Sequence, residues 1–504
     1  MNPMEQLSAL RARGGEQKVL GLPDATIEHF LAHDPKLGQA IAIAAKTVQE
    51  AEDQFSDLLE RDEADLARDL QCDFVQFYDA ETVNQYVAAG ACGPWLVTSR
   101  GAVLHDSGGY GMLGQGHEPA EVLEAMSKSW VMANVMTPSF SHRRFGIALK
   151  NEVGHTRGQC PYERIICMNS GSESVSVAAR IADSNAFAMT RPGARYQGRP
   201  AQLMSMRGGF HGRTTRPAQA SDSCLPKYRQ HLLSFERYPG PILVEPNDIA
   251  ALEAGFAEAE ANGVFIELLL IEPVMGEGNP GRAITRAFYD RARELTHAHG
   301  SLLLLDSIQA GLRATGCLSI VDYPGFEDCD VPDMETWSKA LNAGQYPLSV
   351  LGMNRRAAQA YARGIYGNTM TTNPRALEVG TAVLRSITPE MRQNIRERGV
   401  EFVQKLEALA LELPGTITNV QGTGLLLAAE LNPAIFKVVA SDGVESYCRT
   451  HGIGVIHGGS NALRFTPHFN ITSDEIDMIV RVVRQALVAL SSNQPALTAG
   501  SGGQ

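Results

Sequence analysis

Lys339 is the residue whose surroundings most favour covalent chemistry. It stands in residues 337–344 (WSKALNAG), beside apolar and small side chains rather than charges, and this composition favours burial. Burial and a nearby cation lower the pKa of a lysine, and the neutral amine can attack a carbonyl carbon to form a Schiff base. An ordinary surface lysine is the alternative interpretation.

Asp306 is a second candidate, because it ends the apolar run of residues 301–305 (SLLLL). A carboxylate that follows a buried strand needs a partner, since its unpaired burial is costly. A protonated pyridine nitrogen would be such a partner, and the ion pair would keep the ring electron-poor. A helix cap or a salt bridge within the protein is the alternative interpretation.

Two motifs that contain glycine follow other apolar runs. Residues 169–174 (NSGSES) precede a helical sequence, so Gly171 and Ser172 are placed to hold a phosphate at a helix N-terminus. A Ser/Gly helix cap is the alternative. Phe210, followed by His211 in the motif FHGR, can stack on a flat cofactor or pack in the core.

These motifs all stand where an expected strand ends. Four apolar runs lead into polar or glycine-rich motifs: ERIICM into NSGSES, AQLMSM into RGGFHGRT, FIELLLI into EPVMGEGN, and SLLLL into DSIQAG. In open α/β sheets, ligands bind beyond the carboxyl ends of the strands. The four junctions therefore predict one site along one edge of a sheet.

The wider pattern of the chain predicts an α/β protein. Apolar residues recur at helical spacing between residues 23 and 71, and strands and turns are expected from 75 to 110. From 163 to 340, short apolar runs alternate with helical segments, which is typical of a mostly parallel sheet. Helices and short strands recur from 374 to 490, and a Gly-rich tail follows.

Composition and charge restrict the function classes. The chain has 504 residues and a formal net charge of −12, which argues against nucleic acid or an anionic membrane as the main partner. No transmembrane run and no signal-peptide core are indicated. The eight cysteines are scattered without a CxxC pair, as expected of reduced thiols in a cytoplasmic protein. No metal site is expected.

Taken in order, the motifs resemble those of the class III aminotransferases, a branch of the fold type I pyridoxal phosphate (PLP) enzymes. The resemblance runs from about Ser99 to about Val488. The motifs that carry it are DSGGYGMLGQGHEP, NSGSES, GGFHGRT, IEPVMGEG, LLLLDSIQAG, PDMETWSKALNAG, YGNTMTTNP and ALRFTPHF. It implies a large domain with a mostly parallel sheet flanked by helices, and a smaller α+β domain.

The resemblance also implies roles for cofactor-binding residues. Lys339 matches the Schiff-base lysine and proton shuttle, and Asp306 matches the aspartate that pairs with the pyridine nitrogen. The other matches lie around the ring and phosphate: Ile308 and Phe210 on the two ring faces, Gln309 at the ring hydroxyl, Gly171 and Ser172 in the phosphate loop, and His211 and Glu272 beside the cofactor.

Further matches concern the substrate and a second subunit. Arg464 matches the arginine that binds a substrate carboxylate, which a guanidinium can hold with two parallel hydrogen bonds. Glu277 matches a glutamate that pairs with this arginine as a switch between amine and acid substrates; a structural loop carboxylate is the alternative. Thr369 matches a threonine that reaches the phosphate from the neighbouring subunit, which implies a homodimer with shared active sites.

Two departures from the family pattern stand near these residues. The family usually carries Glu directly after the cofactor aspartate, whereas this chain has Ser307, which predicts the loss of a negative charge. The family often reads GGNP where this chain has TTNP at residues 371–374. The added methyl and hydroxyl groups predict a narrower pocket mouth.

The implied activity is PLP-dependent transfer of an amino group, from an ω-amine of an amino acid or diamine, to a 2-oxo acid such as 2-oxoglutarate. A decarboxylase, racemase or aminomutase on the same scaffold is the first alternative, and a silent PLP-fold binding protein is the second. The expected domains are a helical N-terminal extension (1–75), the first part of the small domain (76–145), the PLP-binding domain (146–375), the second part of the small domain (376–490) and a disordered tail (491–504).

Overall fold

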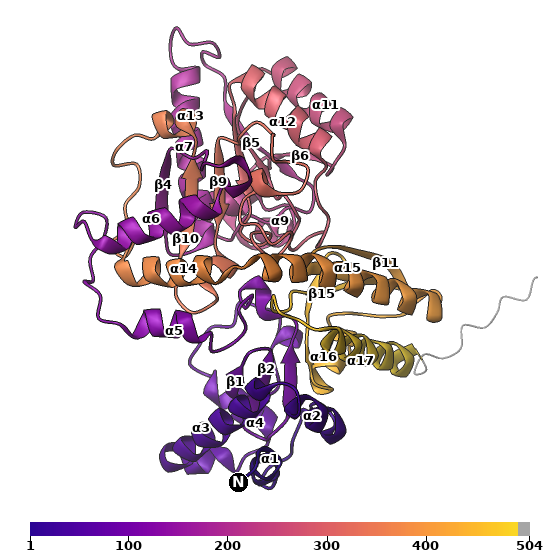
Figure 1. Cartoon of the computed structure of the whole chain (residues 1–504). Coiled ribbons are helices and arrows are strands. Elements are labelled where there is room, and N and C mark those ends of the chain that lie inside the picture. Colours follow the sequence, from indigo (N-terminus) through magenta and orange to yellow (C-terminus); the bar gives the residue numbers. More distant parts are fainter. Residues whose placement is uncertain (492–504) are drawn as a thin grey trace, which may run out of the picture.

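The computed structural model describes residues 1–491. The expected disordered tail lies outside the described residues, except for Ser491, which ends helix α17 (Ser473–Ser491). Three sheets and their helices make up the described chain, with the largest sheet in the upper part of Figure 1 and the N-terminal helices at the bottom.

The largest sheet has seven strands in the order β4-β10-β9-β8-β7-β5-β6. These are β4 (Arg164–Met168), β5 (Ala201–Met206), β6 (Ile242–Val244), β7 (Phe265–Ile271), β8 (Leu302–Asp306), β9 (Met334–Trp337) and β10 (Ser349–Met353). Strands β9, β8, β7, β5 and β6 pair in parallel, and β10 runs antiparallel to β4 and β9. The predicted α/β class with a mostly parallel sheet is confirmed.

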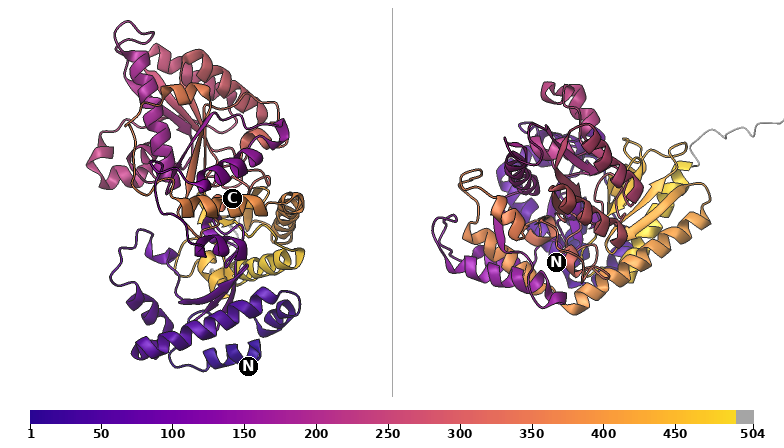
Figure 2. Two further views of the ribbon diagram at one scale, coloured as in Figure 1. Left: turned by 60° about the vertical axis from the view of Figure 1, so that its left-hand side comes forward. Right: turned by 90° about the horizontal axis from the view of Figure 1, so that it is seen from above.

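Helices cover both faces of this sheet because its central strands are apolar on both sides. Leu268 and Leu270 of β7 belong to the core that also contains the apolar face of α7 (Gly171–Thr190). The alternate residues Leu269 and Ile271 belong to the core of α11 and α12. Figure 2 shows the strands between the two helical layers. The helices around this sheet are α7, α8 (Thr215–Ala220), α9 (Leu225–His231), α10 (Leu233–Glu236), α11 (Ile249–Ala261), α12 (Arg286–His299) and α13 (Arg355–Ala360).

Four helices precede the first strand. They are α1 (Pro3–Arg11), α2 (Asp24–Leu31), α3 (Pro35–Leu59) and α4 (Glu63–Leu70). Helix α3 buries Leu37, Ala40, Ala44 and Val48, which lie on one face at helical spacing. It packs closely on β1 (Ala88–Cys92), where a Cβ added to Gly90 would lie 2.3 Å from the backbone nitrogen of Ala44.

Two four-stranded sheets stand below the large one. The first joins β1, β2 (Trp95–Thr98) and β3 (Val103–Asp106) to β13 (Ile453–Gly454), so residues from both ends of the chain share one sheet. The second is antiparallel and consists of β11 (Ile417–Thr423), β12 (Leu426–Leu431), β15 (Ala462–Phe465) and β14 (Ile456–Gly458). The remaining helices are α5 (Ala120–Ser127), α6 (Phe140–Glu152), α14 (Pro374–Ser386), α15 (Pro389–Glu412), α16 (Val444–Thr450) and α17.

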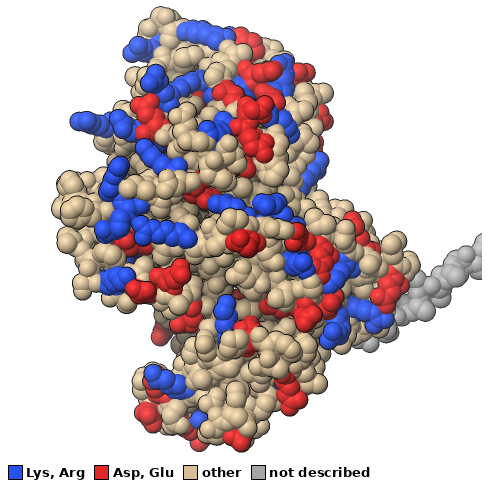
Figure 3. All heavy atoms as spheres, viewed as in Figure 1, with Lys and Arg blue, Asp and Glu red and all other residues tan. Residues whose placement is uncertain are grey.

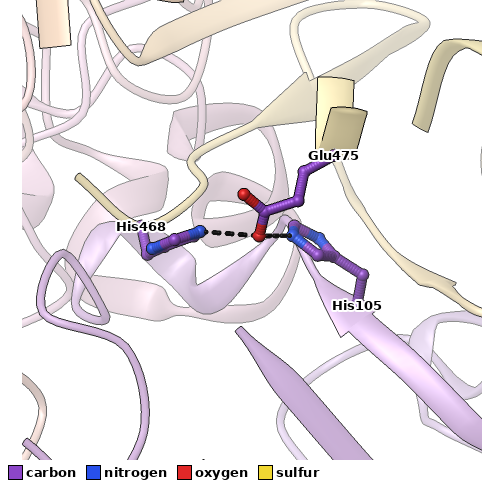
Figure 4. Close-up of side chains that lie close together, drawn as sticks. All are labelled: His105, His468 and Glu475. Atoms are coloured by element: carbon purple, nitrogen blue, oxygen red, sulfur yellow. Dashed lines mark hydrogen bonds and ion pairs between the residues drawn. The ribbon is translucent and has the colours of Figure 1, made fainter. Parts of the chain in front are cut away.

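A buried cluster of His105, His468 and Glu475 ties β3 to the start of α17 (Figure 4). One oxygen of Glu475 lies 3.1 Å from Nε2 of His105 and 3.0 Å from Nε2 of His468. Its other oxygen accepts hydrogen bonds from the backbone N–H and the hydroxyl of Thr472. These residue types can bind a metal, and in this structure the carboxylate makes four protein contacts that join β3 to the start of α17.

The charged surface is mixed in sign. On the face drawn in Figure 3, Lys and Arg side chains alternate with Asp and Glu. Ion pairs between opposite charges at the surface include Arg199–Glu260 and Arg291–Glu253. Among the helices of residues 1–491, none has the length and apolar character needed to cross a membrane.

Candidate active site

A cavity of about 260 Å³ lies at the carboxyl ends of the parallel strands. Every cofactor and substrate residue that the sequence predicts lines this cavity, except Thr369. Residues that follow β4, β5, β7, β8 and β9 meet here, because parallel strands end at the same edge of the sheet. The four junctions thus form one site.

Lys339 follows β9 and opens the short 3-10 helix η5 (Lys339–Asn342) with a positive φ of 44°. Its amine donates a hydrogen bond to Oε1 of Gln309. Burial, followed by the positive charge of Arg464, lowers the pKa of Lys339 to about 8, although nearby carboxylates oppose the shift. A neutral, nucleophilic amine is therefore accessible near neutral pH.

Asp306 ends β8 with a histidine as its partner. Its Oδ2 lies 2.8 Å from Nδ1 of His211, and its Oδ1 accepts a hydrogen bond from the backbone N–H of Ile308 at 3.2 Å. Burial alone would lower the pKa of His211, but the hydrogen bond and charge of Asp306 outweigh it and raise that pKa. The salt-bridge interpretation of Asp306 is thus correct, and its carboxylate still faces the cavity.

Glu272 lines the cavity and joins two loops. Its two oxygens accept hydrogen bonds from the backbone N–H groups of Phe210 and Gly276, each at 2.9 Å. Burial raises the pKa of Glu272 to about 7, since desolvation exceeds the effect of nearby His211. Glu272 therefore acts on the cavity through the positions of these loops.

The start of α7 closes one end of the cavity. Ser170 caps the helix by accepting from the backbone N–H of Glu173, and Oγ of Ser172 accepts from the backbone N–H of Arg213 at 2.8 Å. A Cβ on Gly212, where φ is +116°, would lie 2.0 Å from that hydroxyl oxygen. The helix-cap interpretation holds, and the cap leaves Gly171 and Ser172 facing the cavity.

Arg464 enters the cavity from β15 of the C-terminal sheet. It is buried and donates a hydrogen bond to the carbonyl of Gly276, next to Glu277. Glu277 also lines the cavity, and its carbonyl accepts from Gly459, whose segment precedes β15. A guanidinium and a carboxylate thus stand at one end of the cavity that contains Lys339.

Thr369 lies outside this cavity. It lines a separate groove of about 1050 Å³, together with residues such as Val135, Met136 and Tyr366. The carbonyl of Thr369 accepts a hydrogen bond from the side chain of Asn134 at 3.4 Å. Within one chain, Thr369 therefore does not join the Lys339 site, and its assignment to a neighbouring subunit stays a prediction.

Arg213 is a cavity residue to which the sequence analysis gave no role. Its guanidinium carbon lies 5.5 Å from the ring centre of Phe210 and 5.9 Å from that of Tyr78. It therefore places a second positive charge at the cavity. Its place in the motif FHGR, directly after a strand, was a usable signal.

The residue after Asp306 has a carboxyl group as its partner. Ser307 was expected to remove a negative charge, and its hydroxyl donates a hydrogen bond of 2.6 Å to the buried carboxyl group of Glu335 on β9. Burial raises the pKa of Glu335 above its ordinary value, although the surrounding hydrogen-bond donors oppose the shift. No spacing in the sequence pairs residues 307 and 335, because strand register sets this contact.

The cavity fits PLP in the chemical types of its residues. A lysine of lowered pKa, a buried carboxylate and a helix N-terminus with a serine face one cavity. Glycines allow the strand-end loops to approach each other: a Cβ on Gly171 would lie 2.6 Å from Cδ1 of Ile308, and one on Gly111 would lie 2.3 Å from Nε2 of Gln309. A larger side chain at Gly171 or Gly111 would overlap atoms of the facing loop.

Solved structures share this architecture. The chain resembles the ornithine aminotransferase from Toxoplasma gondii ME49 with a TM-score of 0.73 and 22% identity, over 88% of this chain and 99% of that one. It also resembles N-acetylornithine aminotransferase from Stenotrophomonas maltophilia K279a, with a TM-score of 0.65 and 24% identity, over 85% and 100% of the two chains. These likenesses show that the chain has the fold type I architecture.

The chain belongs to the class III aminotransferase family, whose family model matches residues 78–487. Acetylornithine aminotransferase of Xanthomonas campestris pv. campestris is 30% identical over 392 residues, which cover 76% of this chain and 88% of the relative. Ornithine aminotransferase of Bordetella pertussis is 29% identical over 404 residues, covering 78% and 88%. The predicted family, enzyme class and cofactor are confirmed.

Proposed function

We propose that this aminotransferase takes its amino group from the ω-amine of an amino acid or diamine and gives it to a 2-oxo acid such as 2-oxoglutarate. The observation that carries the proposal is that Arg464 faces the same small cavity as Lys339 and lowers its pKa. A carboxylate held by Arg464 would therefore lie close to the reactive amine. The names of the ornithine and acetylornithine relatives support an ω-amine donor.

The cofactor-binding assignments are part of this proposal. Asp306, oriented by His211, would hold the ring nitrogen protonated. Gln309, whose carbonyl accepts from Lys339, would donate to the ring hydroxyl through its amide nitrogen. Phe210 and Ile308 would hold the ring faces, and Gly171 and Ser172 would hold the phosphate. Glu272 fixes the loops of Phe210 and Gly276.

Proton movement is assigned to Lys339. When bound, the cofactor supplies an electron-poor ring that takes up the electron pair left on the carbon that loses its proton. The amine of Lys339 removes that proton and then donates it at a second position of the reacting group. The hydrogen bond from Nζ to Gln309 orients the amine between these two positions.

The substrate end of the cavity accounts for two kinds of substrate. Arg464 binds the carboxylate of the 2-oxo acid, and Glu277 neutralises Arg464 when an amine end is bound. Arg213, on the Phe210 side of the cavity, adds a cation for a second carboxylate. A dicarboxylic acceptor then has one guanidinium for each end.

The direct test is amino transfer with defined substrates. We expect ornithine, N-acetylornithine or a diamine to convert 2-oxoglutarate into glutamate in the presence of PLP, with ping-pong kinetics. Arg464→Leu should raise KM for 2-oxoglutarate about 100-fold, because a charge-assisted bidentate contact is lost. Release of carbon dioxide, or a product formed without the 2-oxo acid, would contradict the proposal and favour another PLP reaction.

A homodimer with shared active sites is the second part of the proposal. Apolar side chains are exposed next to the groove that Thr369 lines: Val135 is 64% exposed, Met136 82% and Phe140 82%. Exposed apolar patches of this kind are typical of subunit interfaces. We expect dimer mass by analytical ultracentrifugation, and monomers with weakened PLP binding for Met136→Glu; a fully active monomer would contradict it.

The domain limits and the cellular location remain proposals as well. Helix α4 ends at Leu70, before the proposed limit at residue 75, and α14 starts at Pro374, next to the proposed limit at 375. The proposed limit at 145 falls inside α6, and the one at 490 falls inside α17. All eight cysteines are free in the described chain, which supports a cytoplasmic location. Limited proteolysis at these limits and cell fractionation test the two assignments.

A further inference from the structure

Glu335 is a buried carboxylate in the middle of β9, and its side chain has no exposed surface. Its partners are all neutral. Oε1 accepts from the hydroxyl of Ser307 at 2.6 Å and the backbone N–H of Ile320 at 2.9 Å. Oε2 accepts from the hydroxyls of Tyr162, at 2.6 Å, and Ser319. A buried carboxylate is tolerated where such donors surround it.

The position of Glu335 connects the two strands that carry the reactive residues. Glu335 stands four residues before Lys339 on the same chain segment, and Leu305, next to Asp306, is its partner in the β8–β9 ladder. Ser307 is attached to β9 twice, through its hydroxyl to Glu335 and through its backbone N–H to the carbonyl of Thr336 at 3.0 Å. The residue directly after Asp306 is therefore fixed to the strand that leads to Lys339.

We propose that Glu335, acting through Ser307, is a positioning residue that sets the separation of the Asp306 carboxylate and the Lys339 amine. Neither Glu335 nor Ser307 lines the cavity, so both act through their neighbours. The inference rests on the proposed roles of Asp306 and Lys339 toward PLP. The carboxyl group that the family pattern has at position 307 is supplied here across the ladder by Glu335.

Hydrogen bonds to two further segments hold the Glu335 side chain in place. Tyr162 lies just before β4, and its ring meets that of Trp337 edge-on at 5.5 Å. Ser319 and Ile320 belong to the 3-10 helix η4 (Ile320–Asp322) and its cap. Glu335 thus connects three segments behind the site: Ser307 after β8, Tyr162 before β4, and η4 with its cap. Removal of its charge loosens all three.

The test compares Glu335→Gln, Ser307→Ala and the double variant Ser307→Glu/Glu335→Leu with the unchanged holoenzyme. We expect Glu335→Gln to lower kcat about 10- to 100-fold with little change in KM, because misplaced reacting groups lose rate. The apoenzyme should bind PLP more weakly, and the pH titration of the bound-cofactor absorbance should shift. Ser307→Ala should shift the titration in the same direction as Glu335→Gln but by a smaller amount. The double variant should restore the titration of the unchanged holoenzyme.

Glu267→Gln is the matched control, because Glu267 is also a buried carboxylate of this sheet but pairs with Arg216 away from the cavity. It should lower the melting temperature and leave the titration unchanged. An unchanged titration and PLP affinity in Glu335→Gln would overturn the inference, as would an equal shift in the control. If Glu335→Gln does not fold, the titration and the PLP affinity of Ser307→Ala provide the test instead. An unmodified protein that binds PLP without amino transfer would instead contradict the proposed function.

Discussion

Nδ1 of His211 lies 2.8 Å from Oδ2 of Asp306, and both side chains are buried beneath the cavity that Lys339 faces. The pair gives the Asp306 carboxylate a fixed orientation and a compensating donor. It also links protonation of a histidine to the stability of the site, because Asp306 raises the pKa of His211 above its ordinary value of 6.5.

The first prediction concerns the pH dependence of this pair. The stabilisation from a histidine of raised folded pKa is fully present below its unfolded pKa, about 6.5, and is lost as pH rises through the folded pKa. We expect the melting temperature of the apoenzyme to exceed that of His211→Asn most clearly near pH 6, and the gap to narrow at higher pH. A gap that widens with pH would indicate a neutral His211.

The second prediction concerns the amine of Lys339, whose pKa is about 8. Only the neutral amine attacks a carbonyl, so the rate at which apoenzyme gains cofactor absorbance should rise about fivefold from pH 7 to pH 8 and then level off. Stopped-flow mixing with PLP measures this rate. Lys339→Ala should neither gain the band nor turn over. A rate that still rises about sevenfold from pH 9 to pH 10, as for a lysine of ordinary pKa near 10.4, would contradict the lowered pKa.

The third prediction concerns the close approach of two strand-end loops. Gly212→Ala places a methyl group 2.0 Å from Oγ of Ser172, at a φ of +116° that L residues rarely adopt. We expect PLP affinity to fall at least about tenfold, since the serine must move from the phosphate end of the cavity. Equilibrium dialysis measures the affinity. Gly14→Ala, whose nearest neighbour atom lies at 3.9 Å, should leave it unchanged.

The fourth prediction concerns the cluster in Figure 4. Burial opposes ionisation of Glu475, but His468, His105 and their hydrogen bonds outweigh it and lower its pKa well below the ordinary 4.5. Its stabilisation is therefore present above about pH 4.5 and is lost as pH falls through the lower folded pKa. We expect Glu475→Gln to lower the free energy of unfolding by about 3–5 kcal/mol at pH 7, as for other broken buried pairs.

Denaturant unfolding followed by tryptophan fluorescence measures this loss, since the ring of Trp95 lies 5.3 Å from that of His105. Because four contacts occupy the carboxylate, a chelator should leave the transition unchanged. A transition that moves with chelator would show instead that the cluster holds an ion.

The sequence by itself determined the class of the sheet and which end of each strand lies at the cavity. Strand ends such as the one before Asp306 are visible in sequence, because apolar runs of strand length stop where the chain leaves the core. Because parallel strands end at the same edge of a sheet, the sequence alone predicts that Gly171, Phe210 and Asp306 lie close together, as they do in the cavity.

Only the tertiary structure decided which partners these residues have. His211 turned out to pair with Asp306, and Glu335 to supply the carboxyl group missing at Ser307, because ladder register and side-chain direction set these contacts. Arg464 reaches Lys339 from a different sheet more than a hundred residues later, and Thr369 faces a separate groove. Such contacts depend on how sheets pack, and no local spacing in the chain encodes that packing.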